Sequence, residues 1–243
     1  YNTWAARSAG LEVMAEPKIT EAAITLIEKV TGQPRREYRL SQGVAARAIL
    51  GLKPAAWWRL NEFAGPHASD ESGNHRDAVF EREVTYYLEG PRSDAFCAQG
   101  EKNRAAHFVG GRLRARLADL GDRYSVSCWL WNGMPNEGRE VSGWFFSRGR
   151  DHGLGAYGDH FGIGGKSGNT GKLIFFHGDK PQAVAAGKTE IPRWQWQHAV
   201  LVRDQGKVRA YLNGALEFET QAVASFPAAK ARPLSGDGSD TMK

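Results

Sequence analysis

Residues 194–214 constrain the fold of this chain more than any other segment. Side chains of opposite character alternate with a period of two through 198–203 and again through 208–213. Between them, Asp204-Gln205-Gly206-Lys207 has the composition of a turn, and the following Asn213-Gly214 favours a tight turn because both central residues need positive φ. The segment therefore predicts an antiparallel hairpin with one buried face, which places the chain in the all-β class.

The chain after residue 53 shows the same combination of short strands and turn residues. The whole chain has 243 residues, which gives room for one β-sandwich with an appendage or for two small domains. It contains 29 glycines, as expected of a chain with many turns. We predict an antiparallel two-sheet β-sandwich over residues 54–243, because no long helix interrupts the strands. The expected strands are 55–62, 76–81, 105–109, 112–117, 123–131, 142–148, 153–157, 160–164, 172–177, 183–186, 198–204, 207–213 and 215–220.

Residues 1–53 have a different, helical pattern. An apolar stripe through 21–30 follows Thr20, a suitable N-terminal cap. Ser41 could cap a second short helix over 44–50. This region is either the tail of an upstream domain or a helical arm packed on the sandwich.

The charge of the chain is mildly basic, with a formal net charge of +5 and a pI of about 9.2. This excess of positive charge is consistent with an ordinary solvated surface or with attraction to an acidic polymer. Arg112, Arg114 and Arg116 would share one strand face, but the interleaved aromatic residues of a nucleic-acid groove are missing. We therefore expect no nucleic-acid partner.

The sequence shows no targeting segment. There is no run of about 18 apolar residues, so we expect no membrane span. The first ten residues also lack the charged and apolar regions of a signal peptide. Since the chain begins with Tyr1 rather than Met, we interpret it as a piece of a longer protein.

Several motifs in order carry a family resemblance. Residues 45–243 resemble the laminin-G-like modules of the concanavalin A-like jelly-roll family. The matching elements are Ala55–Glu62 as an opening strand, Asp70-Glu-Ser-Gly-Asn74 as a turn, Ala105–Gly110, the Trp-bearing strand Tyr124–Trp131, Trp196–Val200 and Tyr211–Gly214.

The resemblance implies two curved antiparallel sheets and a binding or spacer module of an exported multidomain protein. It also implies a closing strand, which we do not find, because the chain ends in the polar stretch SGDGSDTMK. We therefore expect the jelly-roll domain at 54–243 to lack its closing strand. From the family we expect export to the periplasm, the cell surface or the extracellular space.

One candidate metal site lies in the predicted Asp70–Asn74 turn. The side-chain oxygens of Asp70 and Asn74 could bind their own backbone, as in an Asx-turn. They could instead coordinate calcium, with Glu62 close by in sequence as a further oxygen ligand. Calcium is therefore the candidate cofactor, and the turn alone is the alternative.

Aromatic residues give two candidate ligand sites, because sugar C–H faces pack on aromatic planes. Trp144, Arg148, Asp151 and His152 lie around one predicted strand edge and form the first candidate. The second is Trp194, which lies in a loop after Pro192 and Arg193.

Strand 123–131 places side chains of different roles on opposite faces. Trp129 and Trp131 lie opposite Cys128, which we interpret as a core thiol. A disulfide between Cys97 and Cys128 would also suit an exported protein.

No pattern of catalytic residues is complete. The Glu-x-Asp-x-Glu arrangement of sandwich glycosidases is missing, and Glu217-Phe-Glu219 lacks the central Asp. We therefore predict a non-catalytic module that binds a polysaccharide or another glycan. The alternatives are a structural spacer that contacts another protein domain, and an accessory domain of an enzyme whose catalytic groups lie elsewhere. The sequence does not indicate an oligomeric state.

Overall fold

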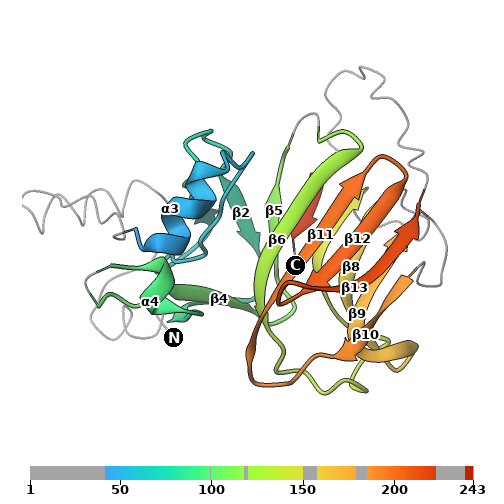
Figure 1. Cartoon of the computed structure of the whole chain (residues 1–243). Coiled ribbons are helices and arrows are strands. Elements are labelled where there is room, and N and C mark those ends of the chain that lie inside the picture. The colour runs from blue at the N-terminus through green and yellow to red at the C-terminus, as the bar shows by residue number, and fades with distance from the viewer. Residues whose placement is uncertain are drawn as a thin grey trace, which may run out of the picture. The chain divides into compact units, whose positions relative to one another are not determined.

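A computed structural model describes residues 42–98, 100–117, 120–149, 158–178, 185–222 and 239–242 (Figure 1). The predicted helix at 21–30 and the predicted strand at 153–157 lie outside these residues. The described chain is mainly β, with antiparallel pairing, as the sequence predicted. None of the helices formed by these residues is long and apolar enough to cross a membrane.

Contacts divide the chain into two compact units. The described part of the first comprises 42–80, 85–98 and 100–107, and the second contains 81–84 and the described residues from Phe108 onward. The first unit therefore includes residues that the sequence analysis assigned to the sandwich.

The first unit combines two short helices with short strands. Helix α3 (Val44–Gly51) forms where the second helix was predicted, although its N-cap is Gly43 rather than Ser41. Gly43 donates its N–H to Phe96 O of helix α4 (Ser93–Phe96) at 3.0 Å. A Cβ at Gly43 would lie 2.2 Å from Ala95 O, so only glycine permits this approach. The unit contains β1 (His67–Ala68) and most of β2 (Ala78–Glu81), β3 (Val84–Glu89) and β4 (Arg104–Phe108), whose residues 81, 84 and 108 belong to the second unit.

The second unit contains strands of two antiparallel sheets (Figure 1). The small sheet has the order β13-β12-β11-β6, and the strands of the large sheet run β5-β14-β7-β8-β9-β10. Strand β11 pairs with β6 over nine residues and with β12 through the predicted hairpin. The strands are β5 (Arg112–Ala115), β6 (Arg123–Trp131), β7 (Val141–Gly149), β8 (Asp159–Gly165), β9 (Gly168–His177), β10 (Ala185–Glu190), β11 (Trp196–Asp204), β12 (Lys207–Leu212), β13 (Ala215–Gln221) and β14 (Ser239–Met242).

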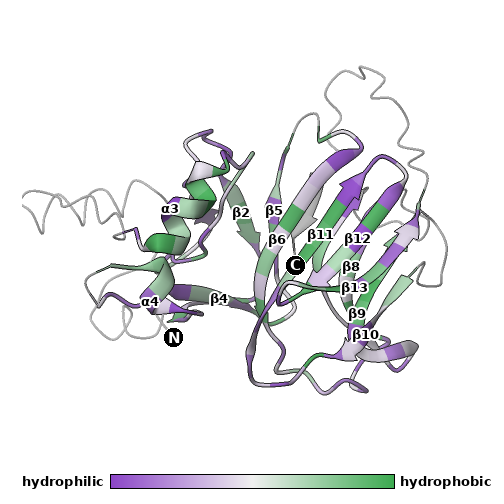
Figure 2. Ribbon diagram, viewed as in Figure 1, coloured by the Kyte–Doolittle hydropathy of each residue, from purple (hydrophilic) through white to green (hydrophobic). Residues whose placement is uncertain are grey.

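The core lies between these two sheets. Along β11, Ala199, Leu201 and Arg203 are buried, and the alternate residues face outward, as period-two alternation requires. The hydrophobic stretches of the second unit follow its strands in Figure 2. The core cluster includes Tyr124, Leu130, Phe146, Phe161, Ile163, Leu173, Phe175, Ala199, Leu201, Val208, Ala210, Leu212 and Phe218.

The core also contains a charged cluster. Asp159 and Arg203 are fully buried, and Tyr124 and His177 both bind the Asp159 carboxylate. Because Asp159 lies on β8 and Arg203 on β11, this cluster joins the two sheets.

Two expectations about strands are wrong. The predicted strand 55–62 has only an isolated bridge between Trp58 and Asp70, and Leu60 has a φ of 58°, which interrupts an extended backbone. The predicted polar loop at the C-terminal end contains β14 instead. Its Thr241 is paired with Arg114 of β5 and with Ser147 of β7, so backbone pairing on both sides forms a strand from a polar sequence.

Candidate functional site

The Asp70–Asn74 turn is organised by its own hydrogen bonds. Asp70 Oδ1 accepts from the N–H groups of Trp57 and Ser72 at 2.8 and 2.9 Å. Its Oδ2 accepts from Ser72 Oγ at 2.8 Å and from Arg76 N at 3.0 Å. Asn74 donates its side-chain amide to the carbonyls of residues 54 and 55. These contacts occupy the Asp70 carboxylate with N–H and O–H donors, as in an Asx-turn.

Glu62 does not join Asp70 in a ligand set. Its Oε1 accepts from Ser69 N at 2.7 Å, whereas Oε2 is buried and has no hydrogen-bond partner. Burial raises the pKa of Glu62, which favours the protonated form over a metal ligand. Among the described residues no three His, Cys, Asp or Glu side chains converge as metal ligands. The contacts of Asp70 and Glu62 therefore favour the turn alone over a calcium site.

Trp144 and Arg148 do not form one cluster. Trp144 packs edge-on against His160 and Phe176, on the face of the large sheet opposite the core. Arg148 lies inward, with its guanidinium 5.3 Å from the ring centre of Tyr124. The pairing of β7 with β8 shifts register between Trp144 and Phe146, and this bulge turns the two side chains to opposite faces. Asp151 and His152 lie outside the described residues.

Trp194 does have an aromatic partner, Trp131 at the end of β6. Their ring centres lie 5.0 Å apart at an interplanar angle of 69°, an edge-to-face contact. Both indoles are nevertheless open to solvent, with 42% of Trp131 and 58% of Trp194 exposed. Two large aromatic side chains are therefore accessible to solvent at one place, which makes this pair the candidate ligand site.

Two loops hold this pair of indoles. Trp194 N donates to Asn132 O, and Arg193 Nη2 donates to Gly133 O, each at 3.0 Å. A Cβ at Gly133 would lie 2.9 Å from both indole rings. Glycine at this position therefore lets the two rings close over the loop.

Trp194 itself has a strained backbone. Its φ of 64° is left-handed, a conformation that a bulky side chain rarely adopts. Such strain persists only where surrounding contacts impose it, and it gathers at ligand sites. The hydrogen bonds that Trp194 N and Arg193 donate to carbonyls of the loop 132–140 supply that restraint. Asn136 of the same loop donates its side-chain amide to Glu190 Oε1 at 3.1 Å.

The aromatic surface continues along the outer face of the small sheet. Trp196 of β11 lies opposite Trp131, and His198 lies opposite Trp129. His198 stacks on Trp129 with ring centres 5.1 Å apart, and its Nε2 lies 2.8 Å from Ser127 Oγ. Burial lowers the pKa of His198, which favours the neutral imidazole. We call Trp129, Trp131, Trp194, Trp196 and His198 the aromatic row.

Of the aromatic row, the sequence predicts only Trp194 as a ligand residue, and it places Trp129 and Trp131 on the strand face opposite Cys128. The local sequence gives no sign that these segments meet. The missing step was the pairing of β6 with β11, which brings the segments together. Cys128 packs against the core as expected, and both Cys97 and Cys128 are free thiols.

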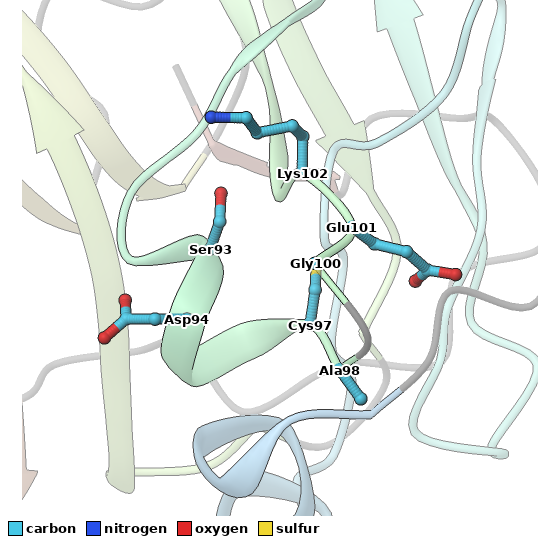
Figure 3. A pocket seen from close by; sticks show the side chains of 7 residues that line it. All are labelled: Ser93, Asp94, Cys97, Ala98, Gly100, Glu101 and Lys102. Atoms are coloured by element: carbon cyan, nitrogen blue, oxygen red, sulfur yellow. The ribbon is translucent and has the colours of Figure 1, made fainter.

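The first unit has a cavity of about 480 Å³ (Figure 3). None of the described residues that line it is aromatic, and Asp94 and Glu101 point to opposite sides in Figure 3. Lys102 extends to Glu89, 2.9 Å away. The cavity therefore offers neither a stacking plane nor a convergent pair of carboxylates. It is lined by Ser93, Asp94, Cys97, Ala98, Gly100, Glu101 and Lys102.

Comparison with solved structures gives low similarity. Domain 4 of AbnA, a GH43 extracellular arabinanase from Geobacillus stearothermophilus in complex with arabinotriose, is 19% identical with a TM-score of 0.45, over 72% of this chain and 76% of that one. The alginate lyase AlgAT5 of polysaccharide lyase family 7 is 13% identical with a TM-score of 0.31, over 74% of this chain and 69% of that one. An alginate lyase from Corynebacterium sp. is 12% identical with a TM-score of 0.28, over 74% of this chain and 68% of that one.

A search of curated proteins found no match. The family comparison is specific: the Laminin_G_3 family, described as the concanavalin A-like lectin/glucanases superfamily, matches residues 110–241. This is just over half of the 243 residues, and the resemblance drawn for 45–109 stays a prediction. The chain belongs to the concanavalin A-like lectin/glucanases superfamily.

Proposed function

We propose that this chain is a non-catalytic glycan-binding module, and that a sugar chain binds on the aromatic row. One observation carries the proposal. Two exposed indoles, Trp131 and Trp194, are held together over Gly133 by a strained backbone and two interlocked loops. Preorganised aromatic planes suit sugar rings, whose C–H faces stack on them without ordering flexible side chains.

The side chains of the aromatic row suit stacking on sugar rings rather than cleavage of a glycosidic bond. Its members are indoles and one neutral imidazole that is engaged with Ser127. Glycoside hydrolysis needs two carboxyl groups across the scissile bond. This composition supports a binding role, and family membership supports a glycan as the ligand and export as the setting.

A glycan array probed with the full chain tests the proposal. We expect binding to at least one polysaccharide, with binding lost in Trp131→Ala and in Trp194→Ala. Phe63→Ala is the matched control, because Phe63 is an exposed aromatic residue of the first unit, and it should bind like the wild type. Incubation of the bound glycan with the chain should release no new reducing ends.

Two results would contradict the proposal. Silence across neutral and acidic glycans would favour a structural spacer that contacts another protein domain. Turnover of a polysaccharide by the purified chain would make the module an enzyme.

A further inference from the structure

The aromatic row extends along two neighbouring strands rather than gathering at one point. Trp129 and Trp131 are two residues apart on β6, so their side chains point to the same face. Since a strand rises by about 3.3 Å per residue, the two positions are separated by about 6.6 Å. On β11, His198 and Trp196 lie opposite them in the same order. The row therefore has an aromatic pair at its Trp131 end and another at its Trp129 end.

Trp194 lengthens the row at the Trp131 end. It precedes Trp196 by two residues, just before β11 begins, and its ring centre lies 5.0 Å from that of Trp131. At the other end, the rings of Trp129 and His198 are stacked with an interplanar angle of 28°. A sugar ring is similar in size to one indole, so a single sugar cannot cover both ends. The two ends are therefore separate stacking positions.

The row is open to solvent at both ends. Trp131 and Trp194 are exposed, and Trp129 and His198 are partly exposed. A site that encloses the terminal sugar of a chain surrounds it with protein on several sides, which would bury the aromatic plane beneath it. Aromatic planes arranged along the outer face of a sheet instead leave room for a chain that continues past both ends of the row.

We infer that the aromatic row binds an internal segment of an extended glycan, about three sugar units long, rather than a chain end or a single sugar. The inference rests on the proposed function and deepens it by naming the part of the glycan that is recognised. Each further sugar that reaches another aromatic plane adds apolar contact. Beyond Trp129 the next outward residues of β6 are Ser127 and Ser125, which offer no further plane. Affinity should therefore rise with the length of the oligosaccharide and then level off.

Titration with oligosaccharides of increasing length tests this inference. The probes are ladders of one to six sugar units, made by partial hydrolysis of each polysaccharide on the array, among them cellulose, xylan, mannan and polygalacturonate. We expect the affinity of the full chain for at least one ladder to increase about two- to tenfold with each sugar up to about the third, and to change little after that. Reduction of the reducing-end sugar of the hexasaccharide to its open-chain alditol should alter the affinity by less than about twofold.

Variants at the Trp129 end give a sharper test. In Trp129→Ala and in His198→Ala, the disaccharide should bind as it does to the wild type, because the two indoles at the other end are intact. The gain in affinity from the third sugar should be lost. Partial unfolding would lower the affinity for every member of a ladder by the same factor, so the dependence on length separates the two causes. Phe63→Ala is again the matched control and should keep the length dependence of the wild type.

The outcomes separate this inference from the function on which it rests. A monosaccharide that binds as tightly as the hexasaccharide overturns the internal segment and leaves glycan binding intact, and so does a hexasaccharide that stops binding once its reducing end is opened. The inference also fails if the length dependence is unchanged in both Trp129→Ala and His198→Ala, or if a polysaccharide binds while no member of its ladder does. If no ladder binds and the array is silent, the proposed function falls with it.

Discussion

Arg203 and Asp159 bind each other through two parallel contacts inside the sandwich. Arg203 Nε lies 2.5 Å from Asp159 Oδ2, and Arg203 Nη2 lies 2.6 Å from Asp159 Oδ1. Neither side chain is exposed. This bidentate geometry is the strongest form of such a pair, and it connects a strand of each sheet.

We predict that Arg203→Met destabilises the chain severely. The substitution leaves the Asp159 carboxylate buried without its main partner, which costs about 3–5 kcal/mol of unfolding free energy. Denaturant unfolding at pH 7 measures it. The double variant with Asp159→Asn should recover part of the loss, because it removes the stranded charge. Arg209→Met, which breaks an exposed ion pair with Glu219, is the control and should change stability far less.

The same pair predicts a loss of stability in acid. Burial alone would raise the pKa of Asp159, but hydrogen bonds from His177, Arg203 and Tyr124 outweigh it and hold the pKa below its ordinary value of 3.8. A carboxyl whose folded pKa is lower than its unfolded pKa stabilises the fold above the unfolded value. That contribution is lost as the pH falls below 3.8 towards the folded pKa.

Thermal unfolding from pH 7 to pH 3 checks this sign. The difference in melting temperature between the wild type and Asp159→Asn should shrink as the pH falls. The other carboxylates titrate alike in both proteins and cancel in this difference. A difference that grew in acid would show that the pKa of Asp159 is not lowered by folding.

Gly133→Ala should weaken glycan binding while the chain still folds. The new Cβ would lie 2.9 Å from both indoles and would push Trp131 and Trp194 apart. Crowding of this kind costs about 1–3 kcal/mol. Gly143→Ala is the matched control, since a Cβ there meets nothing within 4 Å. Titration with an array-selected glycan gives the readout, and equal affinities for the two variants would contradict the role of Gly133.

Comparison of Trp194→Gly with Trp194→Ala should separate the backbone strain at Trp194 from the contribution of its indole to glycan binding. Both remove the indole and should abolish glycan binding. Glycine adopts the left-handed backbone at Trp194 without penalty, whereas alanine keeps a strain of about 1–2 kcal/mol. We therefore expect Trp194→Gly to be the more stable variant in denaturant unfolding. A more stable alanine variant would show that the left-handed conformation is not strained.

Asp70→Ala should unfold the turn at lower temperature without any calcium effect. It removes the acceptor of four hydrogen bonds, each worth about 0.5–1.5 kcal/mol. Added calcium should leave the melting temperature of the wild type unchanged. A calcium-dependent rise that Asp70→Ala abolishes would instead establish a metal site at this turn.

Local patterns were sufficient for the strands that carry the core. Strand 123–131 was predicted at its observed bounds, and alternation placed Trp131 on the strand face opposite Cys128. These features follow from the period of the backbone, which the sequence displays directly. Helix α3 was predicted near its observed bounds, but from a cap at Ser41 that the structure places at Gly43.

The remaining features depend on pairing between distant residues. Strand β14 is polar and owes its conformation to neighbours on both sides. The bulge near Phe146, which separates Trp144 from Arg148, has no sequence signature in either segment. Asp159 was overlooked because its partner Arg203 lies 44 positions away. In each case the feature is set by a contact between residues far apart in the sequence, and the local sequence alone does not indicate it.

Strand β11 points its odd and even positions in opposite directions, with Leu201 inward and His198 outward. The inward side chains of β11 pack the core, and its outward side chains carry the proposed glycan-binding surface. A library that randomises only the outward positions would leave the interior packing untouched. Substitution of these outward side chains, in evolution or by design, could therefore change what the surface binds while the fold is preserved.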